Sequence, residues 1–149
     1  MKLLIALILS LFATPTPLVN PQTKATLTGR WRVKFSLVET PDKNLVFEVK
    51  PKGGGTFLLL DTGPDNKPVP DPLPAVWSET DQGRVSFAAN VELPLGTCCR
   101  EMGTLIFKGT YGSDKSIKGR AIFIASTTDE ENFIGYRSSV GTFTATREP

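Results

Sequence analysis

The chain has 149 residues, a formal net charge of +2 and no histidine, and its pI is near 8.6. This length suits a single domain that buries its own core. Without histidine there is no Ser-His-Asp or Cys-His catalytic arrangement and no use of the commonest zinc ligand, so we expect neither an enzyme nor a cofactor. The basic residues are spread along the chain without a long run, so we expect no nucleic-acid partner.

The N-terminus resembles a targeting segment. One basic residue, Lys2, precedes an apolar run that ends near Ala13 and is followed by a Pro-rich break. The run is shorter than the roughly 20 apolar residues that span a bilayer, and its pattern predicts a secretory signal peptide over residues 1–13. An uncleaved anchor or a buried first strand is the alternative. We therefore expect a secreted or periplasmic protein without a membrane span in its mature form.

Residues 14–26 contain three prolines and no periodicity, which predicts a disordered lead-in to one domain over residues 27–149. Period-two alternation then recurs, first in Trp31, Val33 and Phe35 against polar neighbours, and Thr40–Asn44 is interpreted as a turn. The predicted strands cover residues 30–38, 45–50, 56–61, 75–79, 84–93, 104–111, 117–124 and 139–147.

The predicted strand at residues 56–61 is apolar on both faces, so something must cover its outer side. The next segment, residues 61–74, carries five prolines and is too long for a hairpin. Since proline fixes φ and lacks an N–H donor, we expect a stiff irregular loop that provides this cover.

Eight short strands with turn signals between them, and no helical periodicity, predict an all-β fold. The mostly short connections favour an eight-stranded antiparallel up-and-down β-barrel. A barrel of this size is just wide enough to be filled by side chains or to hold one small ligand.

Three segments carry a family resemblance: Thr28-Gly-Arg-Trp31, Leu105-Ile-Phe-Lys-Gly-Thr110 with Ile117-Lys-Gly-Arg120, and Phe143-Thr-Ala-Thr-Arg147. They resemble the calycin barrels, that is, the lipocalins and avidin-like proteins. The resemblance implies that Arg147 stacks over Trp31 as structural closure of one end, with an apolar pocket at the other. Val33 stands where avidins carry an asparagine, so biotin binding is not implied.

Small residues share the predicted inward face with the aromatic ones, among them Gly109, Gly119 and Ala121. The volume that they leave either receives large rings or forms a ligand cavity. We predict an exported, monomeric barrel that binds a small, mostly apolar ligand. Its predicted lining is Phe57, Trp77, Phe87, Phe107, Tyr111 and Phe123. The alternative is a filled barrel that serves as a protein-interaction or inhibitor module through loops 61–74 and 94–102.

Cys98 and Cys99 are the only cysteines. Adjacent Cα atoms lie about 3.8 Å apart, closer than in ordinary disulfides, so a vicinal disulfide would be strained. Free thiols or an intermolecular bridge remain open as alternatives, and we expect no metal site.

Overall fold

The computed structural model describes residues 27–38, 40–95, 99–112, 114–128 and 134–149. The expected signal peptide (1–13) and lead-in (14–26) lie outside the described residues, as does Cys98.

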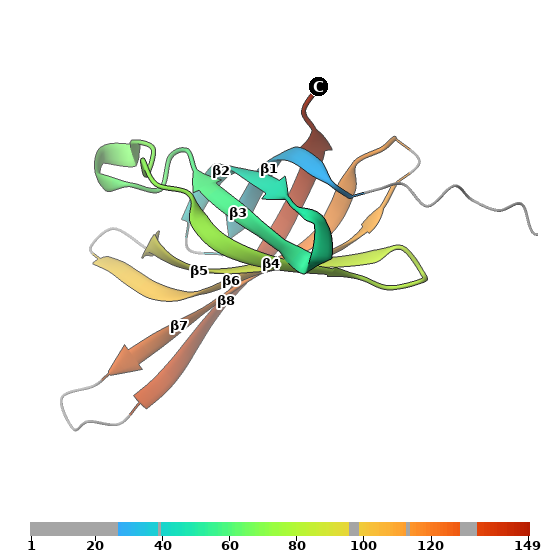
Figure 1. The fold of residues 1–149 in the computed structure, drawn as a ribbon. Helices are drawn as coiled ribbons and strands as arrows, with labels where there is room; N and C mark the ends of the chain where they lie inside the picture. The colour runs from blue at the N-terminus through green and yellow to red at the C-terminus, as the bar shows by residue number, and fades with distance from the viewer. Residues whose placement is uncertain (1–26, 39, 96–98, 113, 129–133) are drawn as a thin grey trace, which may run out of the picture.

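Eight antiparallel strands form one closed barrel in which each strand pairs with its neighbours in the sequence (Figure 1). β8 closes the barrel against β1, from Trp31↔Arg147 to Leu37↔Gly141. This confirms the predicted all-β, up-and-down architecture. The strands are β1 (Gly29–Leu37), β2 (Thr40–Val49), β3 (Gly54–Leu59), β4 (Leu73–Glu79), β5 (Arg84–Leu95), β6 (Cys99–Tyr111), β7 (Ile117–Thr128) and β8 (Ile134–Arg147).

The predicted turn at Thr40–Asn44 is wrong, because these residues begin β2. The β1–β2 register shifts between Phe35↔Lys43 and Leu37↔Thr40, so Pro41 falls within a bulge. A bulge tolerates a residue without an N–H donor. The turn-like composition of the segment therefore marks an irregularity within the strand.

The two ends of the barrel differ. We call the end that carries the β1–β2, β3–β4, β5–β6 and β7–β8 connections the mouth, and the other the closed end. At the mouth, β5 and β6 pair up to Leu95↔Cys99, whereas β6 and β7 pair only up to Gly103↔Ala125. The β7–β8 hairpin leans away from the rest of the barrel at this end (Figure 1). Beyond Gly103 and Ala125, toward the mouth, β6 and β7 therefore no longer pair with each other.

The β3–β4 connection takes the place of β4 beside the upper part of β3. β4 pairs with β3 only between Gly54↔Val76 and Phe57↔Leu73. Beyond that point the Val69 N–H donates to the Leu59 carbonyl, at 2.9 Å. The connection begins with a short 3-10 turn, η2 (Pro64–Asn66), which lies over the mouth end. Another short turn, η1 (Pro51–Gly53), joins β2 to β3 at the closed end.

Alternate residues of every strand point into one apolar core. Alternate residues of β5 are all buried: Val85, Phe87, Ala89, Val91 and Leu93. Six phenylalanine rings meet in the middle of the barrel, with neighbouring centroids 4.5–6.5 Å apart. They are Phe35, Phe47, Phe57, Phe87, Phe107 and Phe143, and we call them the phenylalanine cluster.

Candidate functional site

The predicted lining residues lie at three levels of the barrel. Phe57, Phe87 and Phe107 are fully buried in the phenylalanine cluster. Phe123 is also fully buried but sits nearer the mouth, since its strand neighbour in β8 is Ser139. Trp77 and Tyr111 lie toward the closed end.

Glycines make room for the phenylalanine rings. A Cβ atom at Gly109 would lie 2.8 Å from Cζ of Phe143, and one at Gly55 would lie 2.7 Å from Cε2 of Phe47. At Gly109, therefore, the space left by a small residue receives a ring. An interior ligand would have to lie on the mouth side of the cluster.

The closed end is sealed by Trp31 and Arg147. Trp31 is fully buried, and its indole N–H donates to the Leu27 carbonyl at 2.8 Å. The guanidinium carbon of Arg147 lies 5.7 Å from the indole centroid, and this guanidinium also donates to the Thr28 carbonyl. This geometry ties the start of the described chain to the last strand by a cation–π contact and a hydrogen bond.

Tyr111 and Trp77 complete this end. The ring of Tyr111 meets Trp31 edge-on at 5.6 Å, and burial raises the pKa of its phenol above the usual 10.0. The Trp77 indole donates to the Lys50 carbonyl of the β2–β3 connection, at 2.8 Å. Both predicted lining residues therefore support the closed end.

Between the phenylalanine cluster and the mouth, the barrel wall is mainly apolar. The inward residues at this level are buried: Leu37, Leu45, Leu59, Val91, Leu93, Leu105, Phe123 and Ala125. A lysine interrupts this surface. Lys43 is only 4 % exposed, and its Nζ donates to the Asp61 carbonyl at 3.0 Å and to Oδ1 of Asn66 at 2.8 Å. Both acceptors are neutral oxygens.

The loop above Lys43 is tied down on two sides. The Asp61 carboxylate accepts hydrogen bonds from the backbone N–H of Asn44 at 2.8 Å and from its side-chain Nδ2 at 2.7 Å. From β6, Nη1 of Arg100 donates to the Thr62 carbonyl at 2.6 Å, and Arg100 also pairs with Glu92 at 3.0 Å. The first residues of this connection are thus a fixed part of the mouth.

Three hydroxyl groups at the mouth are buried without a hydrogen-bond partner among the described residues. They belong to Thr40 at 9 % exposure, Thr62 at 0 % and Ser139 at 6 %. Most buried polar groups in proteins are hydrogen-bonded. The hydroxyls and Lys43 therefore give the apolar end of the barrel an unusual supply of polar groups.

Sequence reasoning missed this group because it assigned Lys43 to a turn. A signal was present: Lys43, Leu45, Phe47 and Val49 have period-two spacing, so extending the strand backward places Lys43 on the inner face. The register shift near Pro41 hides that continuation.

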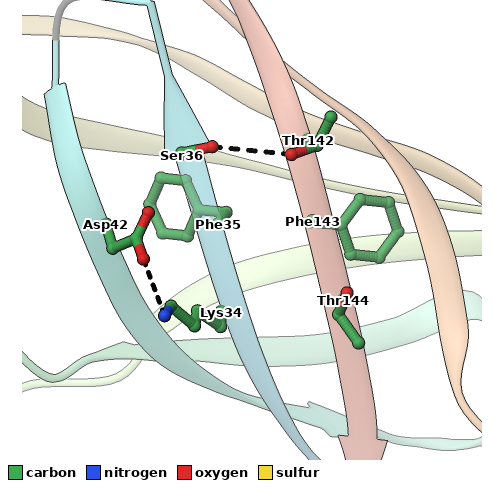
Figure 2. Close-up of a pocket in the computed structure, with 7 residues that line it drawn as sticks. All are labelled: Lys34, Phe35, Ser36, Asp42, Thr142, Phe143 and Thr144. Carbon is green, nitrogen blue, oxygen red and sulfur yellow. Dashed lines mark hydrogen bonds and ion pairs between the residues drawn. The ribbon is translucent and has the colours of Figure 1, made fainter.

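A hollow lies on the outer surface of β1, β2 and β8 (Figure 2). Its volume is about 220 Å³, and polar side chains of Lys34, Ser36, Asp42, Thr142 and Thr144 line it. Lys34 pairs with Asp42 at 2.6 Å, and Ser36 and Thr142 share a hydrogen bond of 3.5 Å (Figure 2). This hollow is open and polar, which does not suit an apolar ligand.

The structure bears less directly on the predictions about the cysteine pair, a metal site and a membrane span. Cys99 is the first residue of β6, opposite Leu95, and the vicinal disulfide stays a prediction. In the part of the chain that the structure describes, no three acidic or cysteine residues gather as metal ligands. Within the same ranges, no helix has the length and apolarity needed to cross a bilayer.

Comparison with known proteins does not identify a family. No family model matches the chain, and no curated protein and no solved structure shows significant similarity to it.

Proposed function

We propose that this protein is an exported, monomeric barrel that binds a small, mostly apolar molecule at its mouth. The observation that carries the proposal is the set of buried, unpartnered hydroxyls of Thr40, Thr62 and Ser139 beside an apolar wall. The closed barrel and the Trp31–Arg147 contact support it by their similarity to lipocalin architecture. The signal-like N-terminus supports export.

The energetics of burial favour a ligand with one polar end. A buried polar group without a partner costs about 1–3 kcal/mol. A ligand whose polar end meets these hydroxyls would remove part of that cost, while its apolar body would gain about 25 cal/mol for each Å² taken out of water.

The test is displacement of Nile red, a neutral fluorescent probe, from the purified mature protein by decanol. Ala125 is buried on the inner face at the mouth, so Ala125→Phe should reduce probe binding at least tenfold. Val140→Phe is the matched control, because Val140 is 42 % exposed. Unchanged binding by Ala125→Phe, in a variant that still unfolds cooperatively, would place the probe elsewhere and reject this site.

A second candidate is a protein-interaction or inhibitor module that acts through loop 61–74 and the tip of the β5–β6 hairpin. The predicted loop 94–102 is wrong at both ends, because residues 94–95 belong to β5 and residues 99–102 to β6, and these strands pair up to Leu95↔Cys99. The filled phenylalanine cluster and the anchoring of Asp61 and Thr62 favour it, because a recognition loop needs a fixed shape. A photo-crosslinker at the exposed Lys67 would then capture one protein in the producing cells. The same crosslinker at exposed Lys118 is the control. Equal capture from both positions would argue against this module.

A further inference from the structure

We propose that Lys43 recognises an anionic oxygen, so that the ligand is an amphiphile with a carboxylate head and an apolar tail. This inference rests on the proposed binding function, because it specifies the chemistry of the same site.

The two hydrogen bonds of the Lys43 Nζ bring no negative charge to the ammonium. An ammonium group has three donors, and the two bonds of Lys43 go to the Asp61 carbonyl and the Asn66 amide oxygen. Burying a charge is costly unless an opposite charge accompanies it. A ligand carboxylate would supply that charge and a charge-assisted hydrogen bond.

The nearby carboxylates of Asp61 and Glu92 have other partners. The Asp61 carboxylate binds the backbone and side chain of Asn44, and Glu92 pairs with Arg100. Glu101 has an inward register position on β6, across the barrel from β2, and takes part in an interaction of its own. The carboxylates of Asp61 and Glu92 are therefore already bound by other donors, and the two hydrogen bonds of the Lys43 Nζ go to neutral oxygens.

Thr62 supplies a further hydrogen-bond donor at the mouth. The Thr62 hydroxyl is fully buried, has no partner within the described ranges, and follows Asp61 directly. A carboxylate has two oxygens with about four acceptor positions. It could accept from the Lys43 ammonium in place of the Asn66 amide and from a mouth hydroxyl as well.

The geometry also gives the ligand a direction. Lys43 lies on the inner face of β2 at the mouth, two residues before Leu45 and opposite Phe35 at the edge of the phenylalanine cluster. A carboxylate at Lys43 would leave the tail against the apolar wall of Leu59, Val91 and Leu105. A neutral alcohol of the same length would have the same tail contacts without neutralising the lysine.

The experiment compares decanoic acid with decanol, each displacing Nile red below its aggregation concentration near neutral pH. The wild-type protein should bind the acid about tenfold more tightly or better, since hydrogen bonds to charged groups contribute about 1.5–3 kcal/mol. Lys43→Met should lose that preference but keep decanol binding. Lys34→Met makes the same change on the outer face, where Lys34 is 63 % exposed, and should keep the preference.

The outcomes separate this inference from the proposed function. If the wild type binds neither compound, the proposed function fails. If it binds both with equal affinity, or if Lys43→Met retains the preference for the acid, the function stands and the role of Lys43 is wrong.

A second variant decides the matter if Lys43→Met does not fold. Asn66→Ala removes the neutral acceptor that a carboxylate would replace, while Lys43 stays in place. It should strengthen binding of the acid relative to that of the alcohol. An unchanged ratio would overturn the inference.

Discussion

The ring of Phe143 occupies the space that a side chain at Gly109 would need. A Cβ atom at Gly109 would lie 2.8 Å from Cζ of Phe143 and 2.6 Å from the Lys118 carbonyl oxygen. Gly109 also faces Gly119 across the β6–β7 pair. Gly109 thus leaves room for the ring, whereas a Cβ atom at Gly119 would meet the β6 backbone, 2.5 Å from Cα of Gly109.

This contact predicts that Gly109→Ala destabilises the barrel. The backbone carbonyl of Lys118 cannot move without disturbing the sheet, so we expect a loss of about 1–3 kcal/mol in the free energy of unfolding. Gly54→Ala is the matched control, because a Cβ at Gly54 would meet nothing within 4 Å. Urea unfolding measures both. Equal stability of the two variants would show that the Lys118 carbonyl and the Phe143 ring both accommodate the added methyl group without cost.

The Trp31–Arg147 contact predicts a stability loss for Arg147→Met. This change removes the cation–π contact and the hydrogen bond to the Thr28 carbonyl, and we expect a loss of about 1–2 kcal/mol in the free energy of unfolding. Arg84→Met, at an exposed position on β5, should change stability by less than about 0.5 kcal/mol. Urea unfolding of both variants tests the difference, and no loss for Arg147→Met would contradict a closing role.

The β6–β7 connection predicts a pH-dependent contribution from Asp114. Hydrogen bonds from Lys118, then from the Ser116 hydroxyl and N–H, hold the pKa of Asp114 well below its usual 3.8. Asp114 therefore binds a proton more readily in the unfolded chain than in the folded one. The ionised carboxylate adds to the free energy of unfolding above about pH 3.8, and this stabilisation is lost as pH falls toward the folded-state pKa.

Asp114→Asn should accordingly lose less stability than the wild type between neutral and strongly acidic pH. Asp71→Asn, an exposed aspartate in the β3–β4 connection, serves as the control and should follow the wild type. The measurement is the urea midpoint as a function of pH. Parallel curves for the wild type and Asp114→Asn would exclude the predicted contribution.

Lys108 and Arg120 face each other directly on neighbouring strands, and both are exposed. Like charges in this position repel each other, and a cross-strand side-chain pair changes the free energy of unfolding by about 0.2–1 kcal/mol. Arg120→Glu should therefore stabilise the barrel by a similar amount, and added salt should reduce this gain.

The control for this pair is Arg84→Glu. Arg84 faces the neutral Thr110 on β6, so reversing its charge should produce no comparable gain. Thermal unfolding at low and high salt compares the two variants. A gain in both, or in neither, would show that the cross-strand repulsion is not the cause.

Much of the fold follows from local pattern. The alternation from Val85 to Leu93 predicts which side of β5 is buried, and the turn residues between apolar segments predict eight antiparallel strands. These features are readable because the two faces of a strand repeat every second residue, whatever its partners are.

The residues of the candidate site could be identified only from the tertiary structure. Period two alone does not reveal that Pro41 falls in a bulge, that Lys43 points inward, or that the Phe143 ring takes the place left by Gly109. These facts depend on the register between strands and on packing between residues far apart in the chain. The sequence by itself determined the strands and their buried faces, because these depend on neighbouring residues. Only the closed barrel decided which rings fill its middle and which polar groups gather at its mouth, because each depends on contacts among several strands.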